Sequence, residues 1–204
     1  MRNISLMLVW LLVSGTALAQ TPTGQLITED AMVTVHRFDQ STGPATIRLK
    51  MDAVAVPLTG APPSFIERGS TFEFNSAQNG ATILVEFKKH WDAPIKVCGP
   101  PMTCDRPIKA MDTVIGETTT LFGNGFVSLF AHRIDPGGSL TSSYFTTRGS
   151  DHIVLIPLTD LHANFGGTEE DLKPGNAYTS DASEIEVSAG SKAARWIVVR
   201  ISKQ

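Results

Sequence analysis

The segment Asp151-His152-Ile153-Val154-Leu155-Ile156-Pro157-Leu158-Thr159-Asp160 has a counterpart 100 residues earlier, Met51-Asp52-Ala53-Val54-Ala55-Val56-Pro57-Leu58-Thr59-Gly60. Both are mainly apolar and both contain Pro-Leu-Thr. Three further pairs of segments match in the same order, namely 35–39 with 131–135, 67–69 with 173–175, and 83–89 with 197–203. The offset grows from 96 to 114 residues, and it grows between the matched segments. We therefore interpret the chain as two related domains, or as two related halves of one domain, of which the second has longer loops.

The matched segments are predicted to be β-strands. Val and Ile are dense in 54–56, 153–156 and 197–199, and turn signals such as Asp135-Pro136-Gly137-Gly138 separate the runs. Strands spaced at about ten residues between such turns are typical of a sandwich or barrel. No long amphipathic helix is expected after residue 19, and 107–116 is expected to hold at most one short turn. The predicted fold class is all-β.

The second half resembles a cupin. Asp135-Pro136-Gly137-Gly138 and 151–160 resemble the opening turn and closing strand of the first cupin motif. The segments 172–178 and 195–201 resemble the Pro-Gly start and final strand of the second motif, and 31–90 is a shorter echo. This resemblance implies two double-stranded β-helix (jelly-roll) barrels. The expected ranges are 20–91 for the first cupin-like half, 92–120 for a linker, and 121–204 for the second cupin-like domain.

The chain departs from the metal-binding cupin pattern. Where the resemblance places the paired His ligands, the chain has Tyr144 and Thr146, and Glu186 lies near the position of the last His. The acidic ligand falls on Asp151 or His152, and the first half offers Arg48, Met51 and Asp52. Divalent metals need three or four fixed N and O donors. We therefore expect no metal and no cofactor.

If a pocket exists, we expect it in the second half, with Tyr144, His152, His132 and Glu186 converging on one cavity. His36 and His132 occupy equivalent repeat positions, and a core His with one hydrogen bond is the alternative for both. The segment His90-Trp91-Asp92 is expected to pack the linker, and His162 to be solvated. Arg37 and Arg133 each precede an Asp by two residues, which predicts an ion pair at each strand end.

Residues 1–19 are typical of a secretory signal peptide. A basic start precedes the apolar run 4–13, and Ala17-Leu18-Ala19 is a small-x-small cleavage site before Gln20. The run is too short for a stable membrane anchor. We therefore predict a periplasmic or secreted protein with no membrane association in its mature form.

The two cysteines, Cys98 and Cys104, are six positions apart, with Gly99 and a Pro-Pro pair between them. In an oxidising compartment such neighbours usually pair, and closing so small a ring stabilises by roughly 2 kcal/mol. A redox pair is the less favoured alternative, because the C-x-x-C spacing is absent. We predict a disulfide loop.

Composition and charge narrow the function classes. The chain has 204 residues, 42% of them hydrophobic, and a formal net charge of −3, which becomes about −4 once Arg2 is removed. This is a globular composition without the basic surface that nucleic acid or anionic lipid requires.

Three functions stay open. The first is a non-catalytic exported protein that binds a small polar ligand. The second is a structural or interaction module, including a homodimer. The third is a divergent cupin enzyme, either metal-dependent through His132, His152 and His162 or a metal-free isomerase or lyase through Tyr144 and His152.

Overall fold

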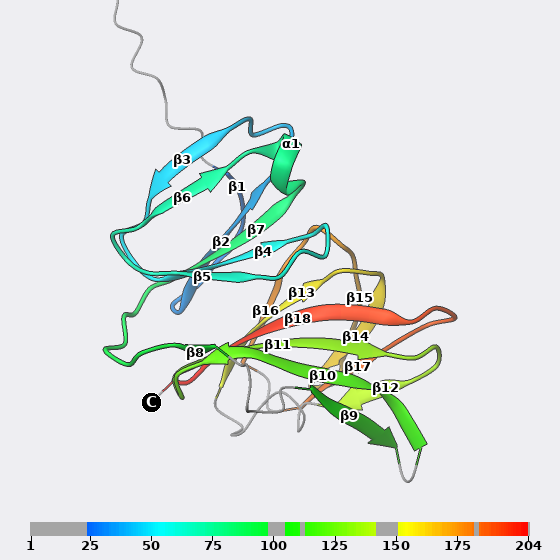
Figure 1. Ribbon diagram of the computed structural model, residues 1–204. Coiled ribbons are helices and arrows are strands. Elements are labelled where there is room, and N and C mark those ends of the chain that lie inside the picture. Colours follow the sequence, from blue (N-terminus) through cyan, green and yellow to red (C-terminus); the bar gives the residue numbers. More distant parts are fainter. Residues whose placement is uncertain (1–23, 98–104, 111–112, 142–150, 182–183, 204) are drawn as a thin grey trace, which may run out of the picture.

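The computed structural model describes residues 24–97, 105–110, 113–141, 151–181 and 184–203 (Figure 1). Within these ranges the chain forms eighteen strands and one four-residue helix, α1 (Ser76–Asn79). The prediction of an all-β protein is therefore confirmed. Among the helices of these ranges, none has the length and hydrophobicity that crossing a bilayer requires.

The N-terminal part consists of two antiparallel sheets. Five strands lie in the order β1–β2–β7–β4–β5, and β3 pairs with β6. The apolar residues between the two sheets include Phe38, Phe72, Phe74 and Leu84, and the Phe38 and Phe72 rings meet edge to face at 5.2 Å. The strands are β1 (Gln25–Glu29), β2 (Val33–Phe38), β3 (Ala45–Arg48), β4 (Ala53–Pro57), β5 (Ser64–Ile66), β6 (Thr71–Phe74) and β7 (Thr82–Phe87).

The C-terminal part is also built of two sheets. The larger has the order β16–β13–β18–β11–β10–β8, with β9 added beside β10, and the smaller has the order β12–β17–β14–β15. Apolar side chains, among them Ile134, Leu155, Val187 and Trp196, fill the space between them. The strands are β8 (Lys96–Val97), β9 (Asp105–Ala110), β10 (Thr113–Gly123), β11 (Val127–Ile134), β12 (Ser139–Thr141), β13 (His152–Pro157), β14 (Leu161–Phe165), β15 (Thr168–Leu172), β16 (Tyr178–Ser180), β17 (Ile185–Ser188) and β18 (Ala194–Ile201).

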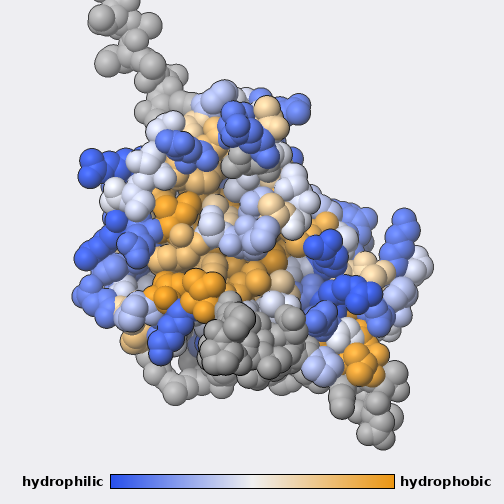
Figure 2. Space-filling view, viewed as in Figure 1, coloured by the Kyte–Doolittle hydropathy of each residue, from blue (hydrophilic) through white to orange (hydrophobic). Residues whose placement is uncertain are grey.

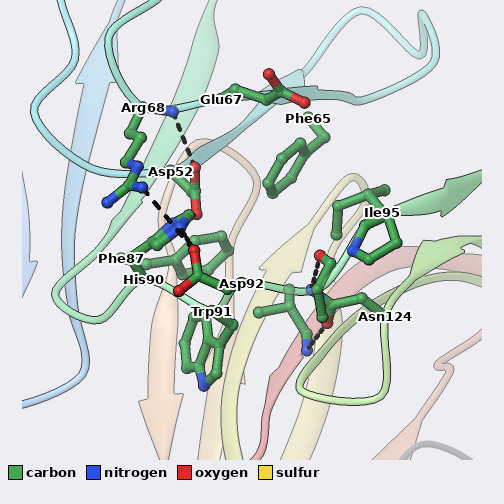
Figure 3. A pocket seen from close by; sticks show the side chains of 13 residues that line it. Asp52, Phe65, Glu67, Arg68, Phe87, His90, Trp91, Asp92, Ile95 and Asn124 are labelled. Carbon is green, nitrogen blue, oxygen red and sulfur yellow. Dashed lines mark hydrogen bonds and ion pairs between the residues drawn. The ribbon is translucent and has the colours of Figure 1, made fainter.

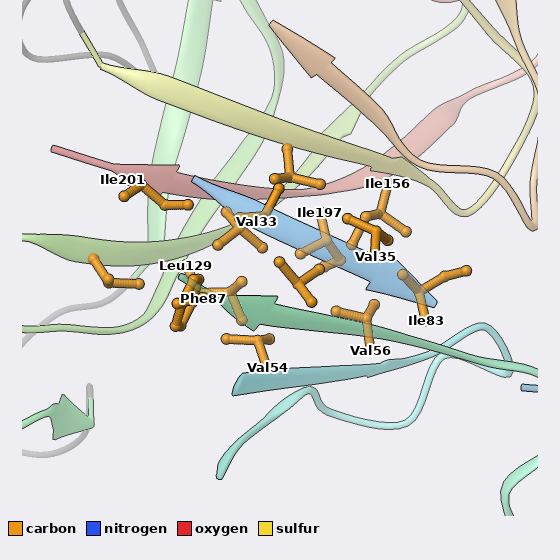
Figure 4. Close-up of a cluster of buried hydrophobic side chains, with 14 of the residues drawn as sticks. Val33, Val35, Val54, Val56, Ile83, Phe87, Leu129, Ile156, Ile197 and Ile201 are labelled. Carbon is orange, nitrogen blue, oxygen red and sulfur yellow. The ribbon is translucent and has the colours of Figure 1, made fainter. Parts of the chain in front are cut away.

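The two large sheets pack against each other and bury a third apolar cluster (Figure 4). Strand alternation explains why their central strands are apolar throughout: Val54 and Val56 of β4 point into this shared cluster, whereas Ala53 and Ala55 point into the N-terminal core. Each fully buried Val or Ile stabilises by roughly 1.5–3 kcal/mol. A cluster of this size therefore strongly favours the packed arrangement of the two parts. Its labelled members are Val33, Val35, Val54, Val56, Ile83, Phe87, Leu129, Ile156, Ile197 and Ile201.

The matched sequence segments occupy matching places in the two large sheets. The strand order β1–β2–β7–β4–β5 of the N-terminal sheet corresponds position by position to β10–β11–β18–β13–β16 of the C-terminal sheet. The equivalent strands β4 and β13 therefore lie beside β7 and β18, the last strands in sequence of their parts. The expected ion pairs also form, with Arg37 Nε 3.0 Å from Asp39 and Arg133 Nη2 3.1 Å from Asp135. Between the parts, Arg37 Nη1 donates to the carbonyl of Gly175 at 3.2 Å.

The region between the halves differs from the expectation. The segment 107–116 was predicted to hold one short turn, but most of it lies in β9 and β10, which pair antiparallel with each other. Much of the range 92–120, expected to be a linker, belongs to the C-terminal sheet. Pro107 lies in β9, which pairs only with β10 among the described strands, and an edge strand is where Pro is tolerated.

Candidate functional site

His132 lies in the core between the C-terminal sheets. Its register partner across the sheet is Trp196, and the two rings stack at 5.1 Å. Its Nδ1 is hydrogen-bonded to the Thr118 hydroxyl. Burial lowers the pKa of His132 to about 3, because the charged imidazolium would lose its hydration. His132 is therefore neutral and packed, which matches the core alternative.

His152 lies on the opposite face of the same sheet. The next residue of β13, Ile153, points into the C-terminal core, whereas Val154 points into the shared cluster. Because side chains alternate along a strand, His152 lies on the same face as Val154, toward the N-terminal part. Its Nδ1 is 2.7 Å from Asp181, and its Nε2 is 3.2 Å from Asp30, which belongs to the turn after β1. His152 therefore links the two parts, and the structure does not bring it together with His132.

The other expected site residues are also dispersed. Glu186 of β17 lines a separate shallow pocket with Thr141 and Asn164. His162 is partly exposed on β14, 3.1 Å from Asp171. In the part of the chain that the structure describes, no three His, Cys, Asp or Glu residues are placed to hold a metal. Tyr144, Cys98 and Cys104 lie outside the described residues.

Inside the C-terminal part the structure reveals a buried polar group that the sequence analysis missed. Arg200 Nη2 donates to Ser128 at 2.8 Å, its Nε is 3.9 Å from Asp151, and its guanidinium lies over the Phe130 ring at 5.6 Å. Burial lowers the pKa of Arg200, and Asp151 opposes this effect. The signal was available, because Arg200 interrupts the otherwise apolar run 197–201.

An open pocket of about 290 Å³ lies beside the junction of the two parts (Figure 3). It is formed by the residue before β4, the segment after β5, the segment that follows β7, and the turn between β10 and β11. Most of it therefore belongs to the N-terminal part and the connecting segment, not to the second half where a pocket was expected. Its lining residues include Asp52, Phe65, Glu67, Arg68, Phe87, His90, Trp91, Asp92, Ile95, Asn124 and Val127.

The polar side of this pocket is centred on His90. The buried Asp52 carboxylate lies 2.6 Å from His90 Nδ1 and accepts the Arg68 backbone N–H at 2.8 Å. On the other side of the ring, His90 Nε2 lies 2.8 Å from Asp92, whose side chain is 92% exposed. Hydrogen bonds to Asp52 and then to Asp92 raise the pKa of His90, against smaller opposing effects of burial and of the Arg68 charge. This arrangement favours an imidazolium that donates from both nitrogens.

The opposite side of the pocket is apolar and is supported by hydrogen bonds of Asn124. Phe65 and Ile95 face the polar group across the opening (Figure 3). Asn124 fixes the far wall, because its amide donates to the Ala93 carbonyl at 3.0 Å and accepts from the Val127 N–H at 2.9 Å. The pocket thus combines convergent polar groups with an apolar wall, as small-molecule sites usually do.

Sequence reasoning missed this pocket for a clear reason. Asp52 and His90 are 38 positions apart, and only the adjacent pairing of β4 with β7 brings them together. Two signals were available in the sequence. Asp52 directly precedes the buried strand β4, and the segment His90-Trp91-Asp92 follows the buried strand β7. The segment His90-Trp91-Asp92 was expected to pack the linker, and Trp91 alone is buried there.

Comparison with known proteins supports a fold relationship. No protein-family model matches the sequence, and no curated protein matches it. AerE from Microcystis aeruginosa superposes with a TM-score of 0.54 at 12% identity, over 89% of this chain and 98% of that chain. At this identity, the match shows that the two chains share a fold over most of their length.

Two shorter superpositions each cover 43% of the chain. A cupin domain from Bordetella pertussis Tohama I covers 43% of this chain and 93% of that chain, with 20% identity and a TM-score of 0.35. The Cupin_2 domain of an XRE family transcriptional regulator from Enterobacter cloacae covers 43% and 96%, with 12% identity and a TM-score of 0.39.

Proposed function

We propose that this chain is an exported, non-catalytic protein of two cupin-like halves that binds a small polar ligand at their junction. Two cupin-like halves are supported by the shared order of the two large sheets and by the repeated Pro-Gly turns. In this proposal the signal peptide covers 1–19, and Cys98 and Cys104 form a disulfide in the periplasm or outside the cell. The intact mass of the protein isolated from the cell envelope should match a chain that begins at Gln20. On reduction, this mass should rise by that of two hydrogens.

One observation carries the ligand-binding role: polar groups converge on an open pocket that has an apolar wall. Large side chains such as Phe74 and Trp196 fill the spaces between the paired sheets inside each part. The pocket at the junction is therefore better suited to hold a ligand than the interior of either part. His90, Asp92 and Arg68 provide directional contacts, and Phe65 and Ile95 provide apolar surface.

The test compares bound molecules in matched variants. Protein purified from its native envelope is analysed by native mass spectrometry for a non-covalent small-molecule adduct. Ile95→Trp should remove the adduct because the indole fills the pocket. Leu26→Trp, on an exposed edge strand away from the pocket, should retain it. Absence of any adduct on the wild-type protein, or its persistence on Ile95→Trp, would contradict the proposal.

An interaction module is a second candidate, favoured by an apolar groove between β5 and β10. The groove has a volume of about 670 Å³, and Val97 within it is 74% exposed. Figure 2 shows hydrophobic side chains gathered across the middle of this face, between the two parts. If copies pair through the groove, Val97→Glu should shift the mass in sedimentation from dimer to monomer. A wild-type monomer at every concentration would exclude pairing.

A further inference from the structure

We propose that the junction pocket takes the carboxylate of a small ligand with an apolar body, and that Asp92 occupies the position of that carboxylate until the ligand arrives. This inference rests on the proposed ligand-binding function and specifies the chemistry of the ligand. It is carried by the geometry of Asp92, by the charges around it, and by the wall opposite.

Asp92 is held at the pocket by two cationic groups. Its Oδ1 is 2.8 Å from His90 Nε2 and 3.9 Å from Arg68 Nη2, while 92% of its side-chain surface remains in water. An exposed ion pair gains little free energy, since water competes for both partners. A second carboxylate that also buries apolar surface therefore has the advantage over Asp92 at the same donors.

Asp52 differs from Asp92 in its burial and in its hydrogen bonds. It is buried, it accepts the Arg68 backbone N–H at 2.8 Å, and it holds His90 Nδ1 at 2.6 Å. These contacts fix the imidazole, so that Nε2 points outward to Asp92 and the pocket. Once Asp92 turns away, His90 Nε2 and the Arg68 guanidinium form a paired donor site, a combination suited to a carboxylate.

The remaining lining selects a small monoanion. The Glu67 carboxylate is directed away from the His90–Asp92 pair in Figure 3, at the rim, where it disfavours a second negative charge on the ligand. Phe65, Ile95 and Val127 supply the apolar wall. A volume of about 290 Å³ is at the lower end of small-molecule sites, which favours a body of about one ring.

The experiment uses three probes of one shape and different charge: 3-phenylpropanoate, 3-phenylpropanamide and 3-phenylpropylamine. Dissociation constants are measured by NMR titration of the mature protein, with the Trp91 indole as the local reporter. We expect the wild-type protein to prefer the carboxylate. Asp92→Ala should bind it about threefold more tightly, because an exposed competitor is gone, and Arg68→Ala should bind it about tenfold more weakly. Asp171→Ala is the matched control, since it removes an exposed carboxylate from His162 outside the pocket.

The outcomes separate this inference from the function on which it rests. Preference for the amine, weakened in Asp92→Ala, would overturn the carboxylate assignment and leave a ligand pocket in place. Equal binding of the carboxylate to wild type and Asp92→Ala would overturn the placeholder role. Failure of all three probes to bind either form would overturn both the inference and the ligand-binding function.

Discussion

Two histidines of this chain show how environment sets the protonation of one residue type. Burial against Trp196 lowers the pKa of His132 to about 3, whereas carboxylates on both sides of His90 raise its pKa. The same fold therefore keeps a neutral imidazole in a core and favours a charged one at a pocket. Each has a consequence for stability that depends on pH.

His132 should make the protein sensitive to mild acid. As the pH falls below about 6.5, the unfolded chain binds a proton at this position that the native state does not, so the free energy of unfolding decreases by up to roughly 1–2 kcal/mol between pH 6.5 and 5. His132→Gln keeps a hydrogen-bonding group but does not titrate. Urea unfolding of His132→Gln should then show a flatter pH dependence in this interval than the wild type. Equal slopes for His132→Gln and wild type would contradict the prediction.

His90 should act in the opposite direction above neutral pH. Because its pKa is raised on folding, its stabilising contribution is complete below about pH 6.5 and is lost as the pH rises through the raised pKa. The charged groups that face it are Asp52, Asp92 and Arg68. Asp52→Asn removes the largest cause and should bring the NMR titration midpoint of the His90 ring back toward its ordinary value. An unchanged midpoint would show that Asp52 is not the cause.

At the scale of elements, the sequence predicts strands well where apolar residues are buried on both faces. Val54 and Val199 lie in such runs, and both are buried in the shared cluster. The stretch that became β10 was missed because polar Thr, Gly and Glu residues dominate it, and Gly and Glu are depleted in strands. Pairing with β11 decides its structure, and pairing is a tertiary contact that local pattern does not contain.

The direction of the site side chains was harder to predict from the sequence than the strands that carry them. The prediction placed His132 and His152 in one cavity, but a residue's face is set by its register within the strand, and these two occupy opposite faces. The Arg–Asp pairs were predictable because both partners lie within two positions of each other. The Asp52–His90 pair was not, because it depends on which strands become neighbours.

The turn before β16 should be a sensitive point of the junction. Gly175 has a φ of +87°, and a Cβ there would lie 2.7 Å from Arg37 Nη1, the group that donates to the Gly175 carbonyl. Gly175→Ala should therefore destabilise by about 1–3 kcal/mol, through backbone strain and displacement of the arginine. Gly167→Ala is the matched control, since φ is +99° but nothing lies within 4 Å of the added Cβ.

The comparison is made by urea unfolding at neutral pH. We expect Gly175→Ala to lose more stability than Gly167→Ala, and the difference to shrink when Arg37→Ala is added to both. If the two glycine variants are equally destabilised, the contact with Arg37 contributes nothing beyond the strain of a positive φ.

At the scale of the whole molecule, the shared cluster makes each half part of the other's core. Val33 and Val85 from the N-terminal sheet and Val154 and Ile201 from the C-terminal sheet are all fully buried in it. Separating the halves would expose this surface to water, at a cost comparable to the net stability of a domain. Neither half should therefore persist alone, although each has a second core of its own.

Cooperative unfolding tests this coupling directly. The chain from Gln20 onward contains two tryptophans, of which Trp91 lies beside the junction and Trp196 in the C-terminal core. Trp196→Phe leaves Trp91 as the reporter, and Trp91→Phe leaves Trp196. In each variant, we expect the fluorescence transition in urea to coincide with the far-UV circular dichroism transition, because both halves lose their structure in one step. If one tryptophan responds at a lower urea concentration than the circular dichroism signal, the halves unfold separately, and the shared cluster is a docking surface between two independent domains.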